Sequence, residues 1–142
     1  MSSDKRSVLL HQSASTESMG FDRFVLGATL AACAYLAQTI PFAPVGHNIE
    51  TMYLWTLVVM AAAALLGFKR IEAVIETVKF NSQYLADLET GKVRTEQINH
   101  LYQTALEKRS RRTLSFYRAR NTALFMSFAC YVATKVFATY LI

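Results

Sequence analysis

Hydrophobic residues are concentrated in three long stretches of the chain, residues 24–40, 52–68 and 122–142. The first two contain no charged residue, and the third contains only Lys135. A helix that crosses a bilayer needs about 17–25 mostly apolar residues, and each stretch meets that length. A buried helix of a soluble bundle would instead carry a polar stripe with the helical period, which residues 52–68 lack. The pattern therefore predicts an all-α integral membrane protein with three transmembrane helices.

The first apolar stretch has a second interpretation, as the apolar part of a cleaved signal peptide. The segment before it is 23 residues long and includes the acidic residues Asp4, Glu17 and Asp22. The segment after it, residues 41–46, offers only a poor cleavage site between small residues. We therefore expect the first stretch to be retained as a transmembrane helix.

Beyond the second stretch, apolar residues continue at alternating intervals of three and four, which is a heptad pattern. No glycine or proline interrupts the chain between Gly67 and Gly91, so we expect the second span to leave the membrane as one long helix. Asn81 is the single polar member of the seam. A buried asparagine fixes the register and the number of partners of a coiled coil; alternatively, Asn81 faces solvent. The predicted seam consists of Ile71, Val74, Val78, Asn81, Leu85 and Leu88.

A second long helix follows the turn near Gly91. Glycine is a common left-handed residue at the end of a helix, and Thr95 with Glu96 suits the start of the next one. The helix is expected to run through residue 121 into the third span. Residues 69–121 thus form an antiparallel helical hairpin rooted in the second and third spans. A pair of helices buries little surface by itself, so we expect its remaining apolar face to meet a second copy of the chain or a membrane-protein partner.

Hydrophobic residues make up 53% of the sequence although its net charge is +5, because the two kinds of residue are segregated. Lys and Arg number three in residues 1–23, eleven in residues 69–121 and none in residues 41–51. These residues concentrate on the cytoplasmic side of membranes. We therefore expect a multi-pass protein of the inner (plasma) membrane, with a cytoplasmic N-terminus, a cytoplasmic hairpin and the C-terminus outside.

The hairpin contains a basic cluster close to the third span. Such cations suit a bilayer with anionic head groups, although the same charges are also what the predicted orientation requires. No nucleic-acid recognition motif accompanies them, so no nucleic acid is expected as a partner. The expected head-group contacts are Lys108, Arg109, Arg111, Arg112, Arg118 and Arg120.

Lys135 is unusual because it lies inside the third apolar stretch. In one interpretation its long side chain extends to the nearby membrane surface. In the other, it contributes to a polar path between helices, because ionisable residues within membranes are often functional. The candidate polar lining of such a path is Lys135, Gln38, Thr134 and Ser127.

The sequence carries no recognisable catalytic or metal-binding motif. Its three histidines and two cysteines lack the spacing of a metal site, and there is no phosphate-binding loop or nucleophilic serine motif. We therefore expect no metal, no cofactor and no catalytic residue, and we do not expect an enzyme.

The expected organisation has four parts: a mobile Ser-rich tail, a transmembrane hairpin, a cytoplasmic stalk and a final span. The leading functional hypothesis is a non-enzymatic membrane protein that self-associates through its spans and stalk, forming or gating a pore in response to a cytoplasmic signal or partner. An accessory or assembly subunit of a larger membrane complex is the first alternative, and an immunity-type protein against a pore-forming toxin is the second. The expected boundaries are 1–20 for the tail, 21–68 for the transmembrane hairpin with its loop at 41–51, 69–121 for the stalk and 122–142 for the third helix.

Overall fold

The computed structural model of the chain describes residues 2–92 and 95–141. It contains three helices in this part of the chain: α1 (Ser2–Thr39), α2 (Ile49–Glu89) and α3 (Glu96–Tyr140). Each helix is long and apolar enough to cross a membrane, judged by length and composition. The prediction of an all-α chain with three candidate transmembrane helices is therefore confirmed, and the chain is a multi-pass membrane protein in architecture.

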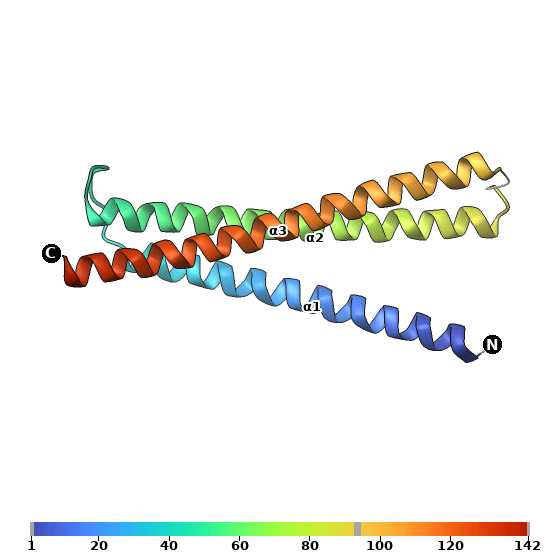
Figure 1. Cartoon of the computed structure of the whole chain (residues 1–142), viewed down its shortest axis with the longest axis horizontal. Coiled ribbons are helices and arrows are strands. Elements are labelled where there is room, and N and C mark those ends of the chain that lie inside the picture. The colour runs from blue at the N-terminus through green and yellow to red at the C-terminus, as the bar shows by residue number, and fades with distance from the viewer. Residues whose placement is uncertain (1, 93–94, 142) are drawn as a thin grey trace.

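Helices α2 and α3 run antiparallel and lie against one another along most of their length, whereas α1 joins them at one end (Figure 1). The loop after α1 and the C-terminal end of α3 lie at the same end of the molecule. The turn between α2 and α3 lies at the opposite end, beyond the apolar stretches. We call residues 71–89 and 96–119, which form that end of the two helices, the paired extension.

Heptad spacing governs the contact between α2 and α3. On α3 the most buried side chains recur every seven residues, at Arg120, Ser127 and Thr134. Facing α2 positions such as Thr56 and Ala63 are also seven residues apart and almost fully buried. A seven-residue repeat keeps the contact on one side of two slightly wound helices, and small side chains let the backbones approach closely.

Helix α1 packs on α2 through one stripe of its C-terminal half, where Leu26, Thr29 and Leu36 are buried. Residues 5–18 are exposed throughout, and the N-terminal end of α1 diverges from the paired extension (Figure 1). Residues 2–20, which the sequence suggested as a mobile tail, thus continue α1. Residues 1 and 142, the outer limits of the expected tail and third span, lie outside the described residues.

The turn after α2 follows the predicted glycine. Gly91 has φ +70°, the left-handed conformation that a residue without Cβ adopts most easily. The N–H groups of Gly91 and Lys92 donate to the carbonyls of Leu88 at 3.1 Å and Asp87 at 3.0 Å. Thr95 stands at the N-cap of α3, although its side chain makes no capping hydrogen bond within the described part of the chain.

Candidate functional site

One buried carboxylate joins all three helices. Asp22 of α1 is 3% exposed, and each of its two oxygens accepts from a different helix. Arg70 Nε of α2 donates to Asp22 Oδ2 at 2.7 Å, and Arg120 Nη1 of α3 donates to Asp22 Oδ1 at 2.8 Å. We call these three residues the charge cluster. It is the most specific polar contact between α1 and the rest of the molecule.

Two guanidinium groups and one carboxylate leave the charge cluster with one uncompensated positive charge. Neighbouring groups disperse it: Asn121 Oδ1 accepts from Arg120 at 3.2 Å and 3.1 Å, and the ring of Tyr117 lies under both arginines. The Arg70 Cζ atom is 4.2 Å from the centre of that ring. Removing charges from water is costly, so such a group persists only when its hydrogen bonds and its partners are well placed.

A glycine makes room for the charge cluster. A Cβ atom at Gly67 would lie 3.6 Å from Arg120 Cδ and 3.3 Å from Leu26 Cδ1. Gly67 is therefore the position at which α2 approaches both neighbouring helices, and the absence of a side chain lets the arginine stem of α3 pass beside it.

The charge cluster lies at one common level of the three helices. At 1.5 Å per residue, about 26 Å of helix separates Asp22 from Thr39, about 32 Å separates Arg70 from Ile49, and about 30 Å separates Arg120 from Tyr140. These lengths match the hydrocarbon thickness of a bilayer, about 30 Å. The charge cluster thus marks the boundary between the apolar spans and the paired extension. Sequence reasoning missed this role of Asp22; the signal was an acidic residue at the edge of one span, with arginines at the matching edges of two others.

Beyond the charge cluster, aromatic side chains hold the paired extension together. The ring of Tyr102 packs between those of Phe80 and Tyr84, with centroids 5.5 Å and 4.9 Å away. The Tyr102 hydroxyl donates to Asp87 Oδ2 at 2.9 Å, and the Tyr84 hydroxyl donates to Asn99 Oδ1. The hydrogen bond to the Asp87 carboxylate raises the pKa of Tyr102, because it stabilises the neutral phenol.

The predicted heptad seam of α2 does not form this contact. The half-buried residues facing α3 are instead Ala73, Thr77, Phe80 and Tyr84, a stripe one position away from the predicted one. α2 carries two adjacent stripes, and the aromatic one fills the space between the helices. Near the charge cluster Ile71 and Val74 are half-buried, and beyond them Asn81 is exposed. The apolar residues of the outer part are also open, with Val78 at 56%, Leu85 at 52% and Leu88 at 41% exposure.

The basic cluster is divided between the surface and the interior. Arg120 differs from expectation: it is 2% exposed and paired with Asp22, so its guanidinium does not reach lipid head groups. Arg109 lies 3.8 Å from a Glu76 oxygen and over the ring of Phe80. The remaining predicted head-group contacts are exposed, namely Lys108, Arg111, Arg112 and Arg118.

The four candidate residues of a polar path occupy two different environments. Ser127 and Thr134 are almost fully buried; the Ser127 hydroxyl donates to the carbonyl of Thr56 at 3.4 Å and that of Thr134 to the carbonyl of Cys130 at 2.7 Å. Gln38 and Lys135 are exposed. The packing therefore places two of these residues inside helix contacts and two on the outside.

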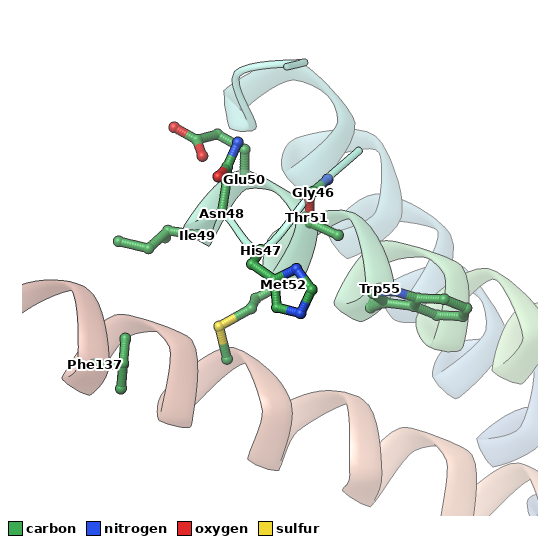
Figure 2. Close-up of a pocket in the computed structure, with 9 residues that line it drawn as sticks. All are labelled: Gly46, His47, Asn48, Ile49, Glu50, Thr51, Met52, Trp55 and Phe137. Atoms are coloured by element: carbon green, nitrogen blue, oxygen red, sulfur yellow. The ribbon is translucent and has the colours of Figure 1, made fainter. Parts of the chain in front are cut away.

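A hollow of about 720 Å³ lies where the loop before α2 meets the C-terminal part of α3. Figure 2 shows its lining, with the Glu50 carboxylate and the His47 ring pointing in different directions. Across residues 2–92 and 95–141, no group of three or more His, Cys, Asp or Glu side chains could hold a metal ion. The two titratable side chains of the hollow, His47 and Glu50, are thus not directed at one another.

Comparison of the chain with family models, with curated proteins and with solved structures gives no match, so its function is inferred from its geometry.

Proposed function

We propose that this chain is a non-enzymatic membrane protein that assembles with further copies of itself through the paired extension. The observation that carries the proposal is the open seam of α2, whose exposed apolar members are Val78, Leu85 and Leu88. The contact with α3 uses the adjacent stripe, so the outer part of the heptad seam, from Val78 to Leu88, remains available. Burying apolar side chains contributes about 25 cal/mol per Å² removed from water, which favours covering this face.

A second copy of the chain is the occupant that best fits this seam. Copies inserted in one membrane with one orientation place their α2 helices parallel and at the same height. A parallel, in-register heptad seam with one asparagine is the arrangement in which Asn81 of one copy meets Asn81 of the next. The membrane itself thus imposes the alignment that the seam needs.

The proposed orientation places the paired extension in the cytoplasm and the C-terminal end of α3 outside, in the inner (plasma) membrane. The support is the distribution of charge: the described parts of residues 69–121 carry most of the basic residues, and the loop between α1 and α2 carries no Lys or Arg. Labelling single cysteines introduced at Ser82 and His47, in a chain with both native cysteines replaced by alanine, tests it. Only the label at His47 is expected to react with an impermeant reagent added to intact cells.

Self-association is better supported than a water-filled path through a single chain. Ser127 and Thr134 are packed inside helix contacts. The outward faces of the spans are apolar, with Phe24, Leu65 and Phe125 among their exposed residues. A path for ions would have to form between copies, and ion flux through vesicles containing only the purified protein would reveal it.

An accessory subunit of a larger membrane complex is the second candidate. It is favoured by the N-terminal part of α1, which diverges from the rest of the molecule and carries exposed Val8, Leu9 and Leu10. These three residues offer a docking surface for a different protein. This candidate predicts that the chain purifies with a fixed partner, whose retention depends on α1 and not on the seam of α2.

The test is the number of copies in the purified full-length protein, measured by native mass spectrometry from nanodiscs. We expect a defined oligomer for the native chain and dissociation into monomers for Leu85→Glu, because a charge cannot be buried in an apolar seam. Leu9→Glu is the matched control: it adds the same charge at a leucine of similar exposure on α1, and it should leave the copy number unchanged. A monomeric native chain, or an oligomer that tolerates Leu85→Glu, would contradict the proposal.

A further inference from the structure

A second polar hollow, of about 200 Å³, lies at the end of the molecule opposite the paired extension. All three helices line it: Tyr35 and Thr39 come from α1, Tyr53 from α2, and Tyr131 and Lys135 from α3. It is separate from the charge cluster, and the proposed self-association does not use it.

The chemistry of this hollow is that of a hydrogen-bond donor site. Lys135 supplies an ammonium group, and among the described residues no carboxylate forms an ion pair with it. The ammonium lies over the ring of Tyr53 in a cation–π contact, with the Lys135 Nζ atom 5.8 Å from the ring centre. The phenol hydroxyls of Tyr35, Tyr53 and Tyr131 likewise make no hydrogen bond to the described part of the protein. Of the residues that the structure describes, no acidic side chain lines the hollow.

The arrangement of these donors is set by packing. The Tyr53 and Tyr131 rings contact one another, with centroids 6.3 Å apart, and both side chains are half-buried. The Thr39 hydroxyl donates to the carbonyl of Tyr35 at 2.9 Å, which leaves its oxygen lone pairs free as acceptors only. The side-chain donors among the lining residues that are left without a partner are therefore one cation and three phenols, a set that matches an anion with several acceptor oxygens.

The depth of the hollow identifies which anion meets it. Lys135 lies about 22 Å along α3 from Arg120 and about 8 Å before Tyr140. An ammonium at that depth, on a flexible stem of four carbons, reaches the level of the lipid phosphates. Leaving it unpaired in hydrocarbon would be costly, so a partner anion at that level is strongly favoured.

We propose that this hollow binds a phosphate group, which in the membrane is the phosphodiester of a phospholipid, held by the ammonium of Lys135 and the hydroxyls of the surrounding tyrosines. The acyl chains of that lipid lie along the exposed apolar side chains of α3 on the same helix face as Lys135, Phe128 and Val132. The bound lipid then bridges the ends of the three helices at one surface, as the charge cluster does at the other.

The experiment measures binding of defined ligands to the delipidated full-length protein by native mass spectrometry. The probes are a short-chain phosphatidylglycerol, the matching phosphatidylcholine and inorganic phosphate. The variants are Lys135→Met, which keeps the length of the side chain without its charge, and Lys135→Arg, which keeps the charge. Lys92→Met is the matched control, because it removes an exposed lysine from the turn at the far end of the molecule.

We expect the native chain to bind one molecule of phospholipid more tightly than any further molecules. In Lys135→Met the affinity for that molecule should be about tenfold lower, which is the loss expected for one charge-assisted hydrogen bond. Lys135→Arg and Lys92→Met should retain it. If inorganic phosphate binds in a way that depends on Lys135 while neither phospholipid does, the phosphate site stands and its occupant is a free anion. If the native chain and Lys135→Met bind all three probes with equal affinity, the proposal is overturned. The copy number and the result for Leu85→Glu test the proposed self-association and do not depend on this site.

Discussion

Asp22 Oδ1 accepts a hydrogen bond from Arg120 Nη1 at 2.8 Å, although 98 residues separate the two along the chain. The contact fixes the height of α1 relative to α3, since both residues lie at the edge of their apolar spans. Arg70 supplies the second donor from α2. One carboxylate therefore aligns three helices at a single level of the membrane.

The charge cluster predicts an order of stabilities. Asp22→Asn leaves the buried guanidinium of Arg120 and the half-buried one of Arg70 without a carboxylate, and we expect it to lower the free energy of unfolding by about 3–5 kcal/mol. Arg120→Met leaves the pair between Asp22 and Arg70 intact with no net charge, so its cost should be smaller. Unfolding of the full chain in mixed micelles with increasing SDS, followed by circular dichroism, measures both.

Glu72→Gln is the control for this comparison. Glu72 pairs with Lys69 at 2.8 Å, but both side chains are more than half exposed, and such a pair contributes little. We expect no measurable change in this variant. If Arg120→Met proved as costly as Asp22→Asn, packing of the arginine stem would outweigh the excess of positive charge in setting the stability of the charge cluster.

Gly67 should be the least replaceable glycine of the spans. In Gly67→Val the added methyl groups meet Leu26 and the stem of Arg120, and overpacking of this kind costs about 1–3 kcal/mol. Gly27→Val is the matched control, because a Cβ at Gly27 has nothing within 4 Å. The same SDS titration should separate the two variants, and equal stabilities would show that α1 can move away from α2 without loss.

Asn81 tests the geometry of the proposed assembly. If its side chains meet across a parallel seam, Asn81→Leu should tighten association and broaden the range of copy numbers, since a buried asparagine restricts coiled-coil partners at a cost in stability. Native mass spectrometry over a dilution series measures both effects. A variant with the native copy number and the native dilution behaviour would place Asn81 outside the interface.

Alkaline pH should loosen the paired extension through Tyr102. The hydrogen bond to Asp87 raises the pKa of Tyr102 in the folded chain above its ordinary value of 10.0. The neutral phenol therefore stabilises the fold fully below pH 10, and this contribution is lost as the pH rises through the raised pKa. Absorbance titration of the native chain minus that of Tyr102→Phe reports the ionisation of this residue alone.

Asp87→Asn provides the check on the cause. Without the carboxylate, the Tyr102 titration should move to lower pH, towards the ordinary value for tyrosine. A titration that stayed in place would mean that the stacked rings of Phe80 and Tyr84, rather than the hydrogen bond, keep the phenol neutral.

The sequence was sufficient for the elements of the fold except the N-terminal part of α1. The three apolar stretches predict the three helices because the free energy of transfer into lipid is summed over a local window of residues. Gly91 predicts the turn between α2 and α3 because the left-handed conformation is a property of one residue. The outward extension of α1 to Ser2 was missed, since a Ser-rich polar segment carries no apolar periodicity that would indicate a helix.

The contacts between helices depended on the tertiary structure. α2 carries two neighbouring stripes, and only the rotation of the helix about its axis decides that Phe80 and Tyr84 face α3 while Val78 and Leu85 stay open. The pairing of Asp22 with Arg70 and Arg120 depends in turn on the relative heights of three helices. Local sequence determines which segments become helices, because that choice is made by neighbouring residues; rotation and height are set by side chains from distant segments packing against each other.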